Sequence, residues 1–423
     1  MFAFPRAAAP ARRIVAALLW SLIACAASAG AQPGLGHDEA IALALQRSAM
    51  LQSRSAATAG AAAFERSAAQ LPDPKLSLSL DNLPINTNDR FSLTRDFMTQ
   101  RQIGWSQEVP NAAKRQARAE AAVARTARER AQLGAERIAV RREASLAWLA
   151  RYFAGQRLAA LDALDAENDL LRSTVTARIA GGKAAPADAV IAQQETLALA
   201  DRRGELERDV AKARAALRRW VGDAADDALV GAPPAFVEPH DAAAARFDTH
   251  PELAAFEPMA EIARAETREI EAAKKGDWSW SVGFAKRGPA YSDMVSVQFS
   301  FDLPLWARQR QDPQIESRRI DAERIDSERE DARRRIVGEV ESLRADAAEL
   351  AGRIARLQTR ALPLADERVA LTLASYQAGR GDLVSVLAAR KDLIETRLRL
   401  IELSAAQAQV RAQLDSHLVK EAP

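Results

Sequence analysis

The segment Val295-Ser-Val-Gln-Phe-Ser-Phe-Asp-Leu-Pro304 alternates apolar and polar residues over its whole length. The segment Trp278-Ser-Trp-Ser-Val-Gly-Phe284 alternates in the same way. A period of two is typical of a β-strand whose two faces meet different surroundings. We therefore predict two strands, each with one face of aromatic and branched side chains and one face of small or polar residues.

This strand pair belongs to a unit that occurs twice. Ser300-Phe-Asp-Leu-Pro304 leads into a charged helix of about 70 residues, and Ser106-Gln-Glu-Val-Pro110 leads into another. The earlier copy has its own alternating segments, around Leu78 and around Trp105. Each copy is expected to run helix, strand pair, long helix, glycine turn, helix. We predict a first structural repeat over residues 32–222, a linker over 223–249 and a second repeat over 250–423.

The first residues have the pattern of a cleaved secretory signal, predicted over 1–31. Arginines precede an apolar run over Ile14–Ala24, and the small residues Ala29-Gly30-Ala31 follow it. The chain's one cysteine, Cys25, follows Leu22-Ile-Ala24, which is similar to a lipobox. Two alternatives remain for Cys25: it is lipidated as the mature N-terminus, or it is removed with the signal peptide. With no other cysteine, the mature chain is expected to lack disulfides and thiolate metal sites.

The charge balance argues against a nucleic-acid partner. The chain has 59 Lys and Arg against 57 Asp and Glu, and loss of Arg6, Arg12 and Arg13 with the signal peptide changes its formal net charge from +2 to −1. Charges of both signs alternate along the long helices, as in Glu330 and Arg334, which predicts solvated helical faces. No mature segment is apolar for about 18 residues, so no transmembrane helix is expected.

Strands with an apolar outer face and a polar inner face are what a barrel in lipid requires. A soluble sheet packed on one side alternates identically, but no other large apolar element is present to cover this one. Four strands cannot close a transmembrane barrel, which needs about eight or more. The chain is therefore expected to oligomerise. Two copies would supply about 8 strands and three about 12, and only the larger barrel leaves a wide lumen.

The helices are expected to extend this barrel as a tube. Apolar residues from Ile336 to Leu364 recur at alternating steps of four and three, the seam of a coiled coil. Helices of about 70 residues would extend on the order of 100 Å. Shorter helices, predicted over Asp38–Gln70 and Asp188–Val221, can lie end to end beside the first long helix. Pro363 predicts a bend in the second.

The mature chain resembles the TolC-like outer-membrane efflux factors over nearly its whole length. The resemblance rests on Leu71-Pro-Asp-Pro74, Val109-Pro110, Leu303-Pro-Leu-Trp306 and Tyr376-Gln-Ala-Gly379, in this order and spacing. Two further segments, Asp81-Asn-Leu-Pro84 and Asp96-Phe-Met-Thr99 with Ile103 to Gln107 after them, are similar to the branch that works with heavy-metal efflux pumps.

The resemblance implies a mainly α fold with a membrane β-barrel part. Three copies would form a 12-stranded barrel in the outer membrane, continued by a helical tunnel through the periplasm. A periplasmic adaptor and an inner-membrane pump of the RND type would join the tunnel at its tip. The implied function is a passive exit duct for heavy-metal cations. Drug efflux and type I protein secretion remain alternatives, and a periplasmic coiled-coil adaptor or scaffold is an alternative of another class.

The resemblance also assigns residues at the tip. Tyr376 and Asp188 match a tether that joins the two helical hairpins, and Arg380 stands one residue before the position of the family's arginine, which is Gly381 here. Members of the family narrow the tip with rings of aspartate, but the corresponding positions here are Ser385 and Ala388. Asp382 is the one acid nearby. Asp188 and Asp382 are equally well explained as helix caps. Gly182 and Gly379 suit tight turns, and the family's adaptor docks at these turns.

No arrangement of residues predicts catalysis. His37, His240, His250 and His417 lack metal-ligand spacing and are expected at the surface. No glycine loop of the phosphate-binding kind follows a strand. We expect neither an enzyme nor a cofactor.

Overall fold

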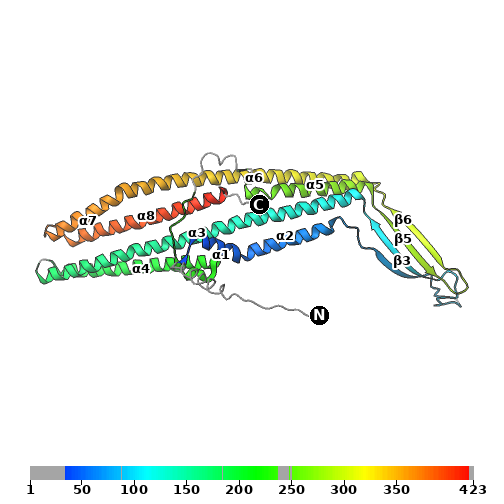
Figure 1. Cartoon of the computed structure of the whole chain (residues 1–423), viewed down its shortest axis with the longest axis horizontal. Coiled ribbons are helices and arrows are strands. Elements are labelled where there is room, and N and C mark those ends of the chain that lie inside the picture. The colour runs from blue at the N-terminus through cyan, green and yellow to red at the C-terminus, as the bar shows by residue number, and fades with distance from the viewer. Residues whose placement is uncertain (1–33, 87, 183, 237–246, 248–249, 419–423) are drawn as a thin grey trace, which may run out of the picture.

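The computed structural model describes residues 34–418, except 87, 183, 237–246 and 248–249. The predicted signal peptide over 1–31, with Cys25, lies outside the described residues, as do His240 and much of the predicted linker. The molecule is long and narrow, with a β-sheet at one end and the turns of two helical hairpins at the other (Figure 1).

The order of elements repeats along the chain, as the sequence predicts. The first set comprises α1 (His37–Arg47), α2 (Ala49–Ala68), β2 (Lys75–Asp81), β3 (Gln100–Val109), α3 (Ala112–Ala180) and α4 (Pro186–Val221). The second set comprises α5 (Phe256–Ala272), β5 (Trp278–Lys286), β6 (Met294–Phe301), α6 (Ala307–Arg356), α7 (Leu362–Gln377) and α8 (Leu383–Leu418). Short pieces complete the chain: β1 (Gly34–Leu35), β4 (Ala228–Leu229), and the single-turn helices η1 (Gly222–Asp226), η3 (Pro251–Leu253) and η4 (Ala273–Lys275).

The longest helix, α3, has 69 residues and runs from the sheet to the far tip (Figure 1). α2 and α4 pack along successive parts of it, as predicted. The segment predicted as one helix over Asp38–Gln70 is instead two helices, because Ser48 adopts an extended conformation and its side chain accepts a hydrogen bond from the backbone N–H of Leu51. This is an N-cap, so Ser48 starts a new helix.

A buried hydrophobic cluster lies in the middle of the molecule. Trp148 of α3 is fully buried, and its indole N–H donates to the carbonyl of Leu35 at 3.1 Å. Leu149 and Leu217 are buried in the same cluster. β1 and β4 pair in parallel here, so the segment just before α1 is fixed against the segment that follows the first helical hairpin.

The coiled-coil seam predicted in the second long helix holds for only part of its length. Ile336 and Val340 are fully buried and Ile354 is mostly buried, but Leu364 is 64% exposed. A π-helical turn over Leu357–Ala361 separates α6 from α7, just before Pro363. Each π turn adds a residue to the helical period, and proline has no N–H to donate, so the apolar positions beyond it rotate out of the seam. The helix bends here, as Pro363 predicts (Figure 1).

The prediction that the histidines lie at the surface is wrong for the described ones. His250 and His417 are buried, with ring nitrogens 3.1 Å apart. The His37 side chain is 11% exposed, and its ring and that of Trp148 form a T-shaped pair with centroids 5.4 Å apart. The residues that bury these histidines are distant from them in the sequence, so the spacing of the histidines alone does not predict their burial.

Candidate functional site

The four long strands form one antiparallel sheet in the order β2-β3-β5-β6. The central pair, β3 and β5, joins the two copies of the repeated unit, with Trp105 opposite Val282. In the described chain β2 and β6 have a neighbour on one side only, so each leaves a row of backbone N–H and C=O groups unpaired.

The register brings the apolar residues of all four strands onto one face. One row across the sheet is Leu76, Trp105, Val282 and Val297, and the next is Leu78, Ile103, Phe284 and Val295. The side chains of these rows are exposed in the single protomer: Leu78 by 77%, Val295 by 70% and Val297 by 59%. Soluble monomers rarely expose a continuous apolar surface of this kind.

The opposite face carries small and polar residues. Its central row is Ser77, Gly104, Gly283 and Ser296. A Cβ at Gly104 would lie 2.5 Å from the Ser77 hydroxyl oxygen, and one at Gly283 would lie 2.3 Å from the Gln102 side-chain nitrogen. The polar face is therefore more crowded than the apolar one, which favours a sheet curved with its polar side inward.

Within the described residues, no helix combines the length and the apolar character needed to cross a membrane.

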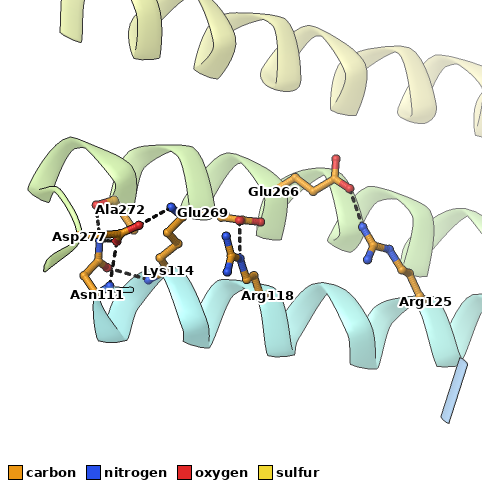
Figure 2. Close-up of polar contacts among 8 residues, drawn as sticks. All are labelled: Asn111, Lys114, Arg118, Arg125, Glu266, Glu269, Ala272 and Asp277. Carbon is orange, nitrogen blue, oxygen red and sulfur yellow. Dashed lines mark hydrogen bonds and ion pairs between the residues drawn. The ribbon is translucent and has the colours of Figure 1, made fainter. Parts of the chain in front are cut away.

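A polar network fixes the sheet to the helices. The backbone N–H of Asn111 donates to the Asp277 carboxylate at 2.9 Å, and Lys114 binds the other carboxylate oxygen at 2.7 Å (Figure 2). The Asn111 side chain caps α3 by accepting from Lys114 N–H, and it donates to the carbonyl of Ala272 at the end of α5. Burial would raise the pKa of Asp277, but the bonds from Lys114 and Asn111 outweigh it and hold that pKa below its usual range.

The network continues along the α3–α5 contact. Arg118 pairs with Glu269 at 2.6 Å and Arg125 with Glu266 at 2.9 Å (Figure 2). These partners are more than 140 positions apart in sequence, so no local pattern predicts them. These ion pairs join α3, which follows β3, to α5, which precedes β5. They therefore fix the first strand pair relative to the second.

At the other end of the molecule, the two hairpin turns have the expected geometry. Gly182 has φ +68° and Gly379 has φ +73°, a region that other residues rarely adopt. Both backbone N–H groups bond to the preceding helix: Gly182 to Ile179 and Gly379 to Tyr376. The two turns, to which the family resemblance assigns adaptor docking, lie at the tip of the molecule (Figure 1).

A small buried cluster joins the two hairpins just behind the turns. It contains Val175 from α3 together with Tyr376, Leu383 and Val386 from the second hairpin. Tyr376 is 3% exposed, and the Arg178 guanidinium lies 4.3 Å from the centre of its ring. Arg178 also donates to the carbonyl of Gln377 at 3.4 Å. Sequence reasoning missed Arg178, which is one of many arginines on a charged helix.

The predicted bond between Tyr376 and Asp188 is not formed. Within the described residues, the Tyr376 hydroxyl has no hydrogen-bond partner, and Asp188 accepts instead from the backbone N–H of Ala185 at the start of α4. Burial raises the pKa of the Tyr376 hydroxyl, Arg178 opposes this, and the negative charge of Asp188 adds to it. Asp188 is thus near enough to act on Tyr376 electrostatically, although its own bond is that of a helix cap.

The other two tip residues are separate from this cluster. Asp382 accepts from the backbone N–H of Ser385 at 2.6 Å, and this bond lowers the pKa of the carboxyl group. Asp382 therefore caps the start of α8, which was the alternative to a role in gating. The Arg380 backbone N–H donates to Ser375 within the turn, and its side chain is exposed.

The part of the chain that the structure describes contains no group of three or more His, Cys, Asp or Glu residues able to hold a metal ion.

Comparison with known proteins connects this architecture to outer-membrane channels. Residues 260–418 match the family model described as outer membrane efflux protein. No curated protein sequence matches the chain.

Solved structures match over most of the chain. One match is CusC, whose crystal structures concern the conformational changes that accompany folding and transmembrane channel formation. It is 17% identical with a TM-score of 0.77, and the match covers 90% of this chain and 91% of that one. The CmeC outer membrane channel of Campylobacter jejuni is 12% identical with a TM-score of 0.74, covering 90% and 86%. The outer membrane protein VceC of Vibrio cholerae is 19% identical with a TM-score of 0.70, covering 89% and 94%. The chain therefore has the fold of these outer-membrane channels, and its residues 260–418 match the outer membrane efflux protein family.

Proposed function

We propose that the chain is the outer-membrane channel of a tripartite efflux system and acts as a passive exit duct. The observation that carries this proposal is the four-stranded sheet with one continuous exposed apolar face and two unpaired edges. In hydrocarbon every backbone polar group needs a partner, so such a sheet is stable in a membrane only when its edges close.

Closure needs several protomers. Each contributes 4 strands, so three copies give a barrel of about 12 strands when β2 of one protomer pairs with β6 of the next. The apolar face then meets lipid, and the serine, glutamine and glycine face lines a water-filled lumen. This arrangement assigns a role to both faces, whereas a periplasmic adaptor or scaffold would leave the apolar face in water.

The helices extend the lumen into the periplasm. The 69 residues of α3 measure about 100 Å at 1.5 Å per residue. The turns at Gly182 and Gly379 then lie at the far end of a tunnel, where a periplasmic adaptor and an inner-membrane RND pump would join it. The proposed location is the outer membrane, with the tunnel in the periplasm.

The proposed cargo is heavy-metal cations. This assignment rests on the segments Asp81–Pro84 and Asp96–Thr99, which are similar to the heavy-metal efflux branch. The duct itself does no chemistry on the cargo, so the pump would select the metal. Drugs or a secreted polypeptide would use the same kind of duct.

Two experiments separate the channel from its cargo. Purified protein added to planar bilayers should produce single-channel conductance, whereas the Val297→Asp variant at the same concentration should not. Stable monomers without conductance would contradict the channel. Deletion of the gene should increase sensitivity to heavy-metal salts more than to drugs. Increased sensitivity to drugs alone would overturn the cargo and leave the channel intact.

A further inference from the structure

The apolar face of the sheet changes character at the end farthest from the helices. At the helix end, its last row is Val109, Trp278 and Phe301. At the distal end, the row after Ile103 and Phe284 places Arg101 opposite Lys286, next to Leu80 of β2. Paired residues in an antiparallel sheet share a face, so two cations occupy the outward face where the apolar rows stop.

These two cations have no carboxylate to neutralise them within the described residues. Arg101 donates to the backbone carbonyl of Arg287 at 3.1 Å, and its Nε is buried with no hydrogen-bond partner in the part of the chain that the structure describes. Two acids adjoin these strand ends: Asp81 pairs with Gln100 on the polar face, and Asp293 directly precedes β6. Among the described residues, neither forms an ion pair with the two cations. Like charges directly opposite one another destabilise a strand pair.

We propose that Arg101 and Lys286 bind the phosphate groups of a glycolipid in the outer leaflet. The proposal rests on the proposed function, because the distal end of the sheet reaches the outer leaflet only if the helices lie in the periplasm. A phosphate supplies the negative charge that would neutralise the two opposed cations, and arginine and lysine are both suited to bind it. The acyl chains of the same lipid would lie against the apolar rows that begin at Ile103 and Phe284.

The two ends of the face differ in the way that this proposal requires. Trp278 and Phe301 at the helix end are typical of an aromatic girdle at a membrane interface. The last strand row at the distal end instead has Arg101 and Lys286, which favours an interface rich in anionic headgroups. Charge complementarity and continuity with the apolar face therefore point to a lipid phosphate rather than to a soluble anion.

Native mass spectrometry of the detergent-solubilised oligomer tests the proposal. The probes are lipid A with two phosphates, the same lipid after removal of its phosphates, and inorganic phosphate. The test variant is Arg101→Gln with Lys286→Gln. The matched control is Arg334→Gln with Lys391→Gln, which removes one arginine and one lysine from exposed positions on the helices.

We expect the wild-type and control proteins to retain lipid A, and the test variant to bind it at least about tenfold more weakly, since each cation near an anionic lipid contributes substantially to binding. Removal of the phosphates should weaken binding to the wild type to the same degree. Equal binding of lipid A by the test variant would overturn the proposal, as would binding of inorganic phosphate alone. Planar-bilayer conductance is measured on the same samples. If the channel conducts and the test variant binds lipid A as the wild type does, only the lipid site is refuted. If the wild type does not conduct, the proposed channel is refuted.

Discussion

Aspartate at Val297 should prevent membrane assembly, whereas aspartate at the neighbouring Gln298 should be tolerated. Val297 lies in the row formed with Leu76, Trp105 and Val282, so a carboxylate there has only apolar neighbours. Gln298 lies on the opposite face, across from Ser281. The two substitutions change consecutive residues of one strand and introduce the same charge.

The expected magnitude follows from where each carboxylate would lie. A charged side chain on the lipid face of a barrel costs up to about 2–4 kcal/mol near the midplane, and acids cost less than bases. We take about 2 kcal/mol for each protomer, which sums to about 6 kcal/mol in a trimer with three equivalent sites. In a sheet exposed to water, by contrast, replacing a side chain that is already 59% exposed would change stability by only about 0.5 kcal/mol.

The assay is the yield of heat-modifiable oligomer extracted from outer membranes. Val297→Asp should greatly reduce that yield, and Gln298→Asp should leave it near the wild-type level. Similar yields for both variants would refute the assignment of the two faces. Phe299→Asp provides a second test on the same face as Val297 and should behave as Val297→Asp does.

Two further predictions concern the tip and the buried histidines. Tyr376→Phe should leave thermal stability unchanged, because the lost hydroxyl has no hydrogen-bond partner among the described residues. Tyr376→Ala should destabilise the protein by about 3–5 kcal/mol and raise single-channel conductance by loosening the tip. Unchanged conductance in the alanine variant would remove the gating role. Burial lowers the pKa of His250 and His417, so the unfolded chain binds protons that the folded chain does not, and stability should be full above pH about 6.5 and fall below it. Urea denaturation over pH 5 to 8 should show this fall, with a smaller one in His417→Gln; an identical pH dependence in both proteins would contradict it.

The strands and helices could be predicted because their signals are local. Period-two alternation identified β5 and β6, and the proline and glycine signals placed the ends of the long helices. The seam was predictable as far as Ile354, where the regular α-helical period ends. The π turn before Pro363 changes that period, so the predicted position of Leu364 was wrong.

The site was predicted less completely because its contacts are between distant segments. The apolar face followed from alternation, but the opposition of Arg101 and Lys286 depends on the β3–β5 register, which no single strand specifies. At the tip, Tyr376 was found by resemblance and Arg178 was missed, since a cation over a ring has no sequence signature. The resemblance also named Asp188, whose charge acts on the pKa of Tyr376, but its carboxylate accepts a hydrogen bond from the backbone at the start of α4.

The most direct test of the proposed channel is disulfide cross-linking between its free strand edges. The chain's one natural cysteine is Cys25, so cysteines introduced on β2 at Ser77 or Ser79 and on β6 at Ser296 or Gln298 can be paired in a Cys25→Ser background. If β2 of one protomer pairs with β6 of the next, at least one combination should form a closed covalent trimer on oxidation in intact outer membranes, with bands that stop at three chains. Monomers in every combination, or a ladder that continues past three chains, would contradict the account.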